Sequence, residues 1–323
     1  MKSIWITWED QRRNRELSRA FNVKLFELSE IDQIKNRFTK YVIGIAKTIK
    51  IYFKEKPKVV FCQNPSLILS FFLVLLKTID RIKVIVDAHN AGLFPKEGRS
   101  RLLGYIARFI QRKANLTIVT NESLKKHVEM NGGHAFVLPD KIPSIPITVP
   151  RKLKGKVNLL FICSYGDDEP YEIVFKAAQN LHDSICVYVT GNYKKKGIEQ
   201  NQLPSNVILI GFVPEPEYVE MLNSVDATIV LTSRENCLVC GAYETVAVEK
   251  PMILSNTNAL RNYFNMGAVY ADDTAEGLER AISNLLAKKD ELSTQVKELK
   301  ISREIEWLKR KEDLEKSVFN CLE

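Results

Sequence analysis

Strand-like segments alternate with helix-like segments along the whole of this 323-residue chain. In the first half, short apolar runs at Ile4–Trp8, Lys58–Gln63 and Lys83–His89 are each followed by a segment that reads as a helix. The alternation starts again with VNLLFICS, ICVYVTG and ATIVLTS in the second half. This order is typical of a parallel sheet with helices on both faces. The sequence therefore predicts an α/β protein of two Rossmann-like domains that face each other across a cleft.

A proline-containing segment, Lys141–Lys156, separates the two series and is interpreted as a linker. We expect one domain over residues 1–145 and a second over residues 155–300.

Charge is divided unequally along the chain. Residues 1–150 contain 26 Lys and Arg against 13 Asp and Glu, a net charge of +13, and residues 151–323 contain 21 against 26, a net charge of −5. The basic half could bind anionic lipid headgroups or a phosphorylated substrate, or it could be a solvated lysine-rich surface. Its basic residues are spread over many elements without a recognition motif, so no nucleic-acid partner is expected.

Membrane and redox signals are weak. The chain starts with a strand-like segment instead of a signal peptide. Its longest apolar run, Leu67–Leu76, is far shorter than the roughly 20 residues of a spanning helix, so we interpret it as a buried helix of a cytoplasmic protein. Cys237 and Cys240 have C-x-x-C spacing, but no second Cys or His pair accompanies them. We expect reduced, buried thiols and no metal site.

Polar residues follow the predicted strands in both halves. They include Ser164–Asp168, Thr190–Asn192 and Ser233–Glu235 in the second half, and Asp87–Asn90 in the first. Turn chemistry explains any one of these groups. Because ligands bind beyond the carboxyl ends of parallel strands, where helix N-termini favour phosphate, the groups together predict a phosphorylated ligand.

The stretch LTSRENCLVCGAYETVAVEKP, residues 231–251, is the strongest candidate site. If a helix begins near Gly241, the backbone N–H groups of Gly241 and Ala242 can approach a diphosphate. Glu244, one turn later, could accept hydrogen bonds from two ribose hydroxyls, or it could simply complement the helix dipole. Glu235 would face another part of the ligand or pair with Arg234.

This stretch and its surroundings resemble the donor-binding region of GT-B glycosyltransferases of family 4 (glycosyl transferases group 1), strongly over residues 185–285 and loosely elsewhere. The chain departs from the family pattern at four places. Asn236 stands eight residues before Glu244 where the family has its first Glu, and Glu249 replaces the usual glycine. SYGDDEPYE replaces a basic pair that neutralises the donor diphosphate, and WEDQRR replaces a glycine-rich loop in the first domain.

The resemblance implies a role for each matching residue. Glu244 would bind the donor ribose, and Glu235 or Asn236 the donor sugar. His89 would lie beside the transferred sugar, and Asp87 is a further catalytic candidate, as are Glu9 and Asp10. The remaining donor-binding candidates are Gly241, Ala242 and Cys240 along the diphosphate, Arg234 as a cation, Phe212 and Val213 at the nucleobase, and Gly191 and Tyr165 at strand ends. The resemblance also implies that a terminal helix, residues 301–323, packs back on the first domain.

These observations predict a nucleotide-sugar-dependent glycosyltransferase of hexosyltransferase type. Its donor would be a UDP- or GDP-sugar, with no other cofactor. Its acceptor would be a glycan or a lipid-diphosphate-linked saccharide in surface polysaccharide synthesis, with anomeric retention and no metal. The basic first domain suggests peripheral attachment to the inner membrane face. Two alternatives stay open: a GT-B sugar-nucleotide epimerase, and a non-catalytic relative that binds a partner enzyme.

Overall fold

The computed structural model describes residues 2–64 and 66–320. It consists of two compact units. The first comprises Met1–Asp140 together with Trp307–Glu323, and the second comprises Lys141–Glu306. Each unit contains one six-stranded sheet in which every strand pair is parallel. The predicted α/β class with two Rossmann-like domains is confirmed.

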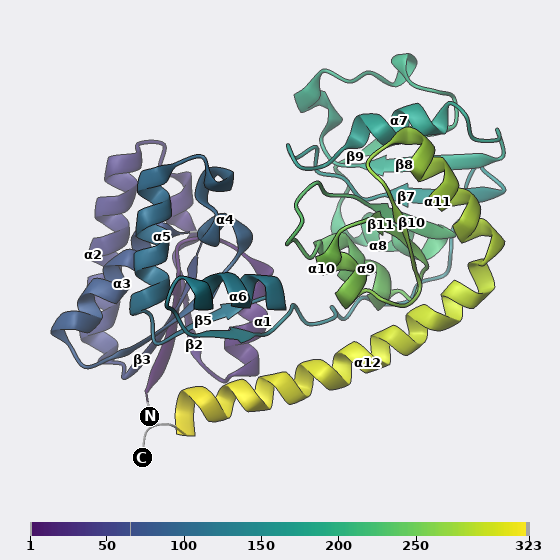
Figure 1. Cartoon of the computed structure of the whole chain (residues 1–323). Helices are drawn as coiled ribbons and strands as arrows, with labels where there is room; N and C mark the ends of the chain where they lie inside the picture. The colour runs from purple at the N-terminus through teal and green to yellow at the C-terminus, as the bar shows by residue number, and fades with distance from the viewer. Residues whose placement is uncertain (1, 65, 321–323) are drawn as a thin grey trace. The chain divides into compact units, whose positions relative to one another are not determined.

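The first sheet has the order β2-β1-β3-β4-β5-β6 (Figure 1). Its strands are β1 (Ser3–Thr7), β2 (Lys24–Glu27), β3 (Val59–Asn64), β4 (Lys83–Ala88), β5 (Leu116–Val119) and β6 (Ala135–Val137). Because all six strands are parallel, their carboxyl ends lie along one edge of the sheet. The polar residues that follow β1, β3 and β4 are therefore brought together there.

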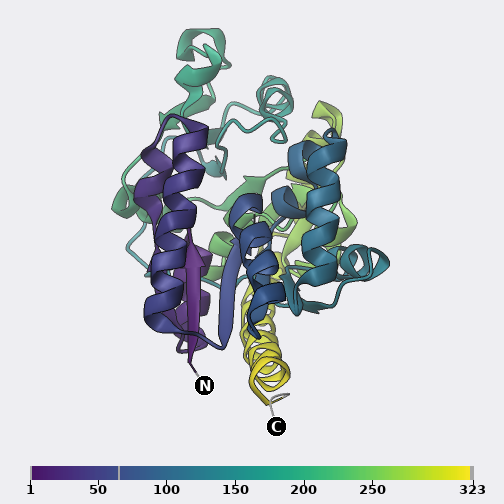
Figure 2. The ribbon, with the colours of Figure 1, turned by 90° about the vertical axis from the view of Figure 1, so that its left-hand side faces the viewer.

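Side chains on alternate positions of these strands enter two different cores, because successive residues of a strand point to opposite faces. Ile4 and Ile6 of β1 pack with the helices α2 (Arg37–Glu55), α3 (Leu67–Ile79), α5 (Arg101–Lys113) and α6 (Glu122–Met130). Trp5 packs on the other face with α1 (Arg12–Ala20) and with the end of the chain. Helices lie on both faces of the sheet (Figure 2).

The long helix α12 (Lys289–Glu315), followed by the π-helical turn η5 (Lys316–Asn320), contributes to both units. Trp307 and Leu314 are buried in the same core as Trp5, and the Trp307 indole donates to the Pro139 carbonyl at 3.1 Å. The predicted terminal helix thus packs on the first unit over its described part. Residues 321–323 of that prediction, including Cys321, lie outside the described residues.

The second sheet has the order β12-β11-β10-β7-β8-β9. Its strands are β7 (Val157–Phe161), β8 (Ile185–Thr190), β9 (Val207–Gly211), β10 (Ala227–Val230), β11 (Met252–Ser255) and β12 (Ala268–Ala271). The chain starts at the central β7 and builds the sheet outward in both directions. The loops after β7 and β10 therefore flank the switch point at which ligands bind in folds of this kind.

Two layers of helices cover this second sheet. One face carries α7 (Tyr171–Ala178) and α11 (Ala275–Ala287). The other carries α8 (Glu215–Ser224), α9 (Cys240–Ala247), α10 (Asn258–Tyr263) and the first part of α12. The short helices are η1 (Ser29–Gln33), α4 (Asn90–Leu93), η2 (Pro95–Gly98), η3 (Tyr193–Lys196) and η4 (Gln200–Gln202).

Apolar residues recur at helical spacing over residues 31–56, yet this segment is divided into η1 and α2, because the Asn36 side chain accepts from the Thr39 N–H and starts a new helix. Two local predictions need correction. The helix expected to be buried at residues 67–76 exposes Leu75, and Cys240 is exposed instead of buried. Among the described residues, no helix is long and apolar enough to cross a membrane.

Candidate functional site

Glu244 lies on α9 in the second unit and is held by a residue that the sequence did not suggest. The Tyr218 hydroxyl of α8 donates to Glu244 Oε2 at 2.5 Å. Burial, and next the negative charge of Glu244, raise the pKa of Tyr218, so its hydroxyl stays protonated as the donor. The carboxylate is thus oriented before any ligand binds.

The start of α9 is very closely packed. The helix begins at Cys240, and its N-cap residue, Val239, forms no side-chain cap. A Cβ on Gly241 would lie only 3.0 Å from Ile162 and 3.1 Å from Val230, and the Ala242 side chain is fully buried. The small residues at this point are therefore required for α9 to pack on the sheet, and only their backbone can reach a ligand.

The acidic loop after β7, which stands where the family has its basic pair, ties two strand-end loops together. Asp168 accepts from Thr232 Oγ1 at 2.7 Å and pairs with Arg234 at 3.2 Å. Glu169 accepts from the backbone N–H groups of Ser164 and Gly166 at 2.8 and 2.7 Å. The acids fix the loops after β7 and β10, and Arg234 is held beside them.

Tyr165 and Gly191 lie in this same region. Tyr165 is buried and has a left-handed backbone with φ 61°. Gly191, at φ 87°, approaches so closely that a Cβ would lie 2.2 Å from the Cys163 carbonyl oxygen. Glycine is therefore the residue that lets the loop after β8 pass this point.

The other donor-site candidates are less closely grouped. Glu235 Oε1 accepts from the Asn258 N–H at 2.8 Å, so this carboxylate caps the start of α10. Asn236 is half-buried on the same loop. Phe212 follows β9 with its side chain 88% exposed, and Val213 is half-buried. The structure thus brings Arg234, Tyr165, Gly191 and the start of α9 to one edge of the sheet, with Phe212 projecting into solvent.

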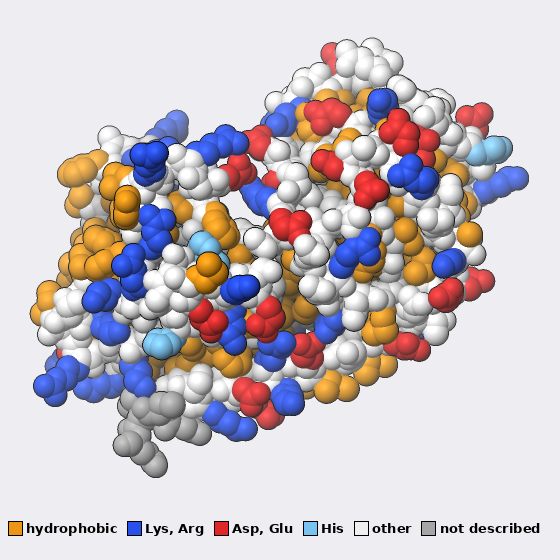
Figure 3. Space-filling view, in the orientation of Figure 1, with side chains coloured by type: hydrophobic (Ala, Val, Ile, Leu, Met, Phe, Trp, Pro, Cys, Tyr) orange, Lys and Arg blue, Asp and Glu red, His pale blue; other side chains and the backbone are white. Residues whose placement is uncertain are grey.

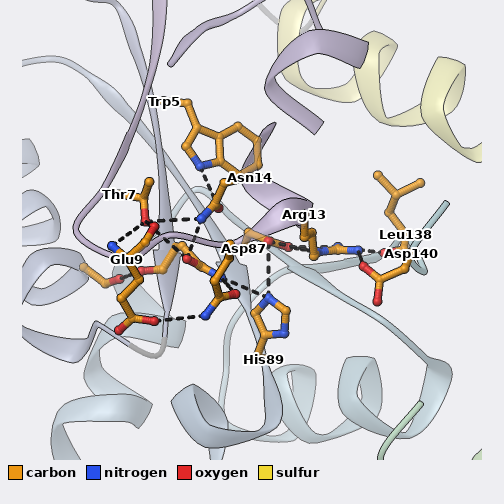
Figure 4. A network of polar contacts seen from close by, with 12 residues as sticks. Trp5, Thr7, Glu9, Arg13, Asn14, Asp87, His89, Leu138 and Asp140 are labelled. Atoms are coloured by element: carbon orange, nitrogen blue, oxygen red, sulfur yellow. Dashed lines mark hydrogen bonds and ion pairs between the residues drawn. The ribbon is translucent and has the colours of Figure 1, made fainter. Parts of the chain in front are cut away.

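A second polar cluster lies at the carboxyl edge of the first sheet (Figure 4). The Trp5 indole donates to Asn14 Oδ1 at 3.1 Å, and Asn14 Nδ2 donates to Gln63 Oε1 at 2.6 Å. Gln63 Nε2 then lies 3.3 Å from His89 Nε2. Because an amide nitrogen can only donate, His89 Nε2 accepts and the ring proton resides on Nδ1. The chain of bonds fixes the tautomer of His89, whose side chain is partly exposed.

Asp87 is buried behind His89 and is neutralised by Arg13. The carboxylate is 1% exposed and receives two bonds from Arg13, at 2.9 Å each, while Arg13 also pairs with Asp140 at 2.7 Å. Burial alone would lower the pKa of Arg13, but the charges of Asp87 and Asp140 outweigh burial and raise it. His89 Nε2 is 3.8 Å from Asp87. Because Nε2 accepts from Gln63, Asp87 forms no hydrogen bond with this ring, and its carboxylate is buried in the ion pair with Arg13.

The WEDQRR segment therefore replaces the glycine-rich loop with a polar cluster. Besides Arg13, which Asn14 directly follows, it supplies Glu9, which accepts from Gln11 Nε2 at 3.0 Å and has a pKa raised by burial and by Asp32. Sequence reasoning missed Arg13, Asn14, Asp140, Asp168 and Tyr218 as partners. Only the placement of Gln63 and Asp87 at the ends of apolar strands hinted at the cluster. Among the described residues, no three His, Cys, Asp or Glu side chains form a group that could hold a metal ion.

Solved structures show which fold class these two units define. Sucrose-phosphate synthase from Thermosynechococcus elongatus is similar at a TM-score of 0.79 and 13% identity, over 99% of this chain and 100% of that one. Anabaena HepE in complex with UDP is similar at a TM-score of 0.74 and 10% identity, over 98% of this chain and 99% of that one. The lipopolysaccharide outer core galactosyltransferase WaaB is similar at a TM-score of 0.64 and 14% identity, over 100% of both chains. The fold is therefore GT-B.

A family model matches the second half of the sequence. Residues 149–303 match the profile of the family described as glycosyl transferases group 1. No curated protein sequence matches the chain. The second unit is accordingly a glycosyl transferases group 1 domain, and the chain is a nucleotide-sugar-dependent glycosyltransferase.

Proposed function

We propose that this glycosyltransferase moves a hexosyl group from a UDP- or GDP-sugar to a glycan or lipid-diphosphate-linked saccharide in surface polysaccharide synthesis, with retention and without a metal ion. The observation that carries the proposal is Glu244, oriented by Tyr218 at the start of α9 inside the family domain. HepE, a structural neighbour, has been solved with UDP and with UDP-glucose, which favours UDP as the nucleotide.

In the proposed complex, the second unit binds the donor. Glu244 accepts hydrogen bonds from the ribose hydroxyls, and the backbone of Cys240, Gly241 and Ala242 at the start of α9 lies along the diphosphate. Arg234 adds positive charge there, while Phe212 and Val213 lie at the base and Glu235 or Asn236 at the sugar. Tyr165 and Gly191 shape the neighbouring loops.

The transfer step exchanges one bond at the anomeric carbon for another. The bond to the diphosphate oxygen breaks, and the nucleoside diphosphate leaves with the electron pair. A bond to the acceptor oxygen forms on the same face, and the acceptor proton passes to the leaving phosphate. His89, with its proton on Nδ1, donates a hydrogen bond to the transferred sugar, Gln63 positions the His89 ring, and Asp87 lies behind it in the ion pair with Arg13. Positioning and neutralisation of the leaving group supply the rate enhancement.

The acceptor is assigned to the first unit because that unit combines positive charge with exposed apolar side chains. Figure 3 shows hydrophobic side chains over α2 and α3 and basic ones over α5. Phe38 and Phe53 of α2 are 78% and 65% exposed. A surface of this composition suits the anionic inner face of a membrane, where a lipid-linked acceptor would be found.

The first test is a calorimetric panel of UDP, GDP, ADP and CMP. We expect one nucleotide to bind and Glu244→Ala to weaken it by about 1.5–3 kcal/mol, the value of a hydrogen bond to a charged group. Tyr218→Phe should weaken it by about 0.5–1.5 kcal/mol, because the carboxylate remains but loses its orienting partner. Glu217→Ala, an exposed acid on α8, is the matched control and should change nothing.

Transfer is measured with the donor sugar of the nucleotide that binds. No binding of any nucleotide, or equal binding by wild type and Glu244→Ala, would contradict the proposed donor site. Conversion of the sugar nucleotide without acceptor would indicate an epimerase. Binding with no turnover on any acceptor would indicate a non-catalytic relative.

A further inference from the structure

The first unit contains a cavity of about 360 Å³ that none of the donor-site candidates lines. Its walls include Leu93, Phe94, Arg101, Tyr105, Arg108 and His127. The volume falls within the range of small-molecule sites, roughly 300–1,000 Å³. All of these residues belong to the first unit. Leu93 is the last residue of α4, the short helix that begins directly after His89, and Phe94 follows it.

Two arginines on one helix supply the positive charge of this cavity. Arg101 and Arg108 are seven residues apart on α5, so they lie on the same face, about 10 Å apart along the axis. Within the described part of the chain, neither guanidinium forms a salt bridge with a carboxylate. Arg108 instead lies over the Tyr105 ring, 4.7 Å from its centroid. Both cations are therefore available to an anion from outside.

Gly104 lines the cavity between the two arginines and adds no side chain to it. A Cβ at this position would make ordinary van der Waals contact with an Arg108 guanidinium nitrogen, at 3.5 Å, so only a larger side chain would fill the space. His127 forms part of the wall, its ring 4.4 Å from that of Phe94. Burial, and then the charge of Arg108, lower the pKa of His127, so a neutral ring faces the cavity at pH 7. The polar centre of the site is thus cationic, compact and free of competing acids among its lining residues.

Apolar side chains lie beside the two arginines. Phe94 and Tyr105 line the cavity, and Tyr105 is 65% exposed. An apolar lining beside two arginines fits a ligand that is anionic at one end and hydrocarbon at the other. Guanidinium groups bind phosphate oxygens in bidentate geometry, and a diphosphate offers enough oxygens for both.

We infer that this cavity binds the diphosphate of a lipid-linked acceptor, with Arg101 and Arg108 on the phosphates and Phe94 and Tyr105 against the first part of the lipid. The inference rests on the proposed lipid-linked acceptor and gives that acceptor a specific anchor. The cavity lies at the C-terminal end of α4, and His89 directly precedes α4, so the proposed anchor is close in sequence to His89.

The test uses farnesyl diphosphate as a soluble probe, with calorimetry on the full chain. We expect it to bind wild type, and Arg101→Gln and Arg108→Gln each to weaken binding roughly tenfold or more. Gly104→Leu, which fills the cavity without removing charge, should weaken it similarly. The matched control is Arg112→Gln with Lys113→Gln, which removes two exposed cations of α5 that do not line the cavity. This control should bind like wild type.

Two further probes separate the sources of affinity. Inorganic diphosphate and farnesol should each bind at least tenfold more weakly than farnesyl diphosphate. Equal binding of inorganic diphosphate would overturn the lipid assignment, and an equal loss in the Arg112/Lys113 control would overturn the cavity. UDP affinity, measured on every variant, should not change. A chain that binds farnesyl diphosphate in the cavity but no nucleotide would leave this inference standing while the proposed function fails.

Discussion

The tautomer of His89 is determined by a tryptophan far from it in the sequence. The Trp5 indole can only donate, so Asn14 must present its oxygen to Trp5 and its nitrogen to Gln63. Gln63 in turn presents its nitrogen to His89. Each orientation follows from the one before it, and the result is a ring that offers an Nδ1 proton to a ligand.

Gln63→Glu should reverse this arrangement. An ionised carboxylate can still accept from Asn14, but it cannot donate to His89, so the ring proton should move to Nε2. Nitrogen-15 NMR of the imidazole distinguishes the two tautomers, and the transfer rate should fall roughly fivefold, about the value of one hydrogen bond. Gln11→Ala, which alters a neighbour of Gln63 but not the donor to His89, should leave the nitrogen spectrum unchanged. A wild-type spectrum in Gln63→Glu would contradict the assignment.

At the scale of elements, α12 stabilises parts of the molecule that are distant in sequence. Its first half contributes Val296 and Leu299 to the core around α9. Lys300 donates to the Ala247 carbonyl and pairs with Glu249, both at 2.9 Å. Glu249 has φ 58° at the end of α9, a left-handed conformation that explains why the family has glycine there. The contacts with Lys300 offset part of the cost of a larger residue at this position.

The second half of α12 should be essential to the first unit. Trp307→Ala removes a buried indole and its bond to Pro139, so we expect a loss of about 3–5 kcal/mol in the free energy of unfolding. Leu308→Ala, one residue further on an exposed face, should change it by less than about 0.5 kcal/mol. Urea denaturation followed by circular dichroism measures both, and similar losses for the two variants would show that the helix does not pack as described.

At the scale of the whole molecule, charge and exposed apolar surface coincide in the N-terminal half. Residues 1–150 have a net charge of +13, from 26 Lys and Arg against 13 Asp and Glu. Phe38, Val42, Ile49 and Phe53 form an exposed stripe along α2 at helical spacing. Lysines of α2 accompany this stripe, which is the composition of helices that lie in a membrane interface.

Vesicle sedimentation should therefore depend on both charge and apolar surface. We expect binding to vesicles that contain phosphatidylglycerol, little binding to pure phosphatidylcholine, and weakening between 50 mM and 500 mM salt as exposed charges are screened. Phe38→Ser with Phe53→Ser should weaken binding at every salt concentration. Ile301→Ser with Ile305→Ser, which removes two exposed apolar residues of α12, is the control and should have no effect. Absence of binding at any salt would remove the membrane part of the proposed function.

The sequence alone determined the class of the protein. Alternating apolar runs and helical spacing define a parallel sheet with helices, because both patterns are local properties of the chain. The same local reading located Glu244, Gly241 and the polar strand ends, including His89 and Asp87. It could not assign their partners. Arg13 meets Asp87 and Asp140 across 74 and 127 residues, and Tyr218 meets Glu244 across 26.

Only the tertiary structure decided which of these groups face a ligand. The Asp87 carboxylate is buried and paired with Arg13, and Gly241 allows α9 to pack closely on the sheet. Asp168, in the loop that replaces the family's basic pair, accepts a hydrogen bond from the loop after β10. The cavity on α5 was not predicted from the sequence, because it forms only when residues 93–108 fold into α4, η2 and α5 and pack against His127 of α6. Spacing along the chain encodes secondary structure, whereas burial and hydrogen-bond partners depend on strand order and on how the loops pack at the sheet edge.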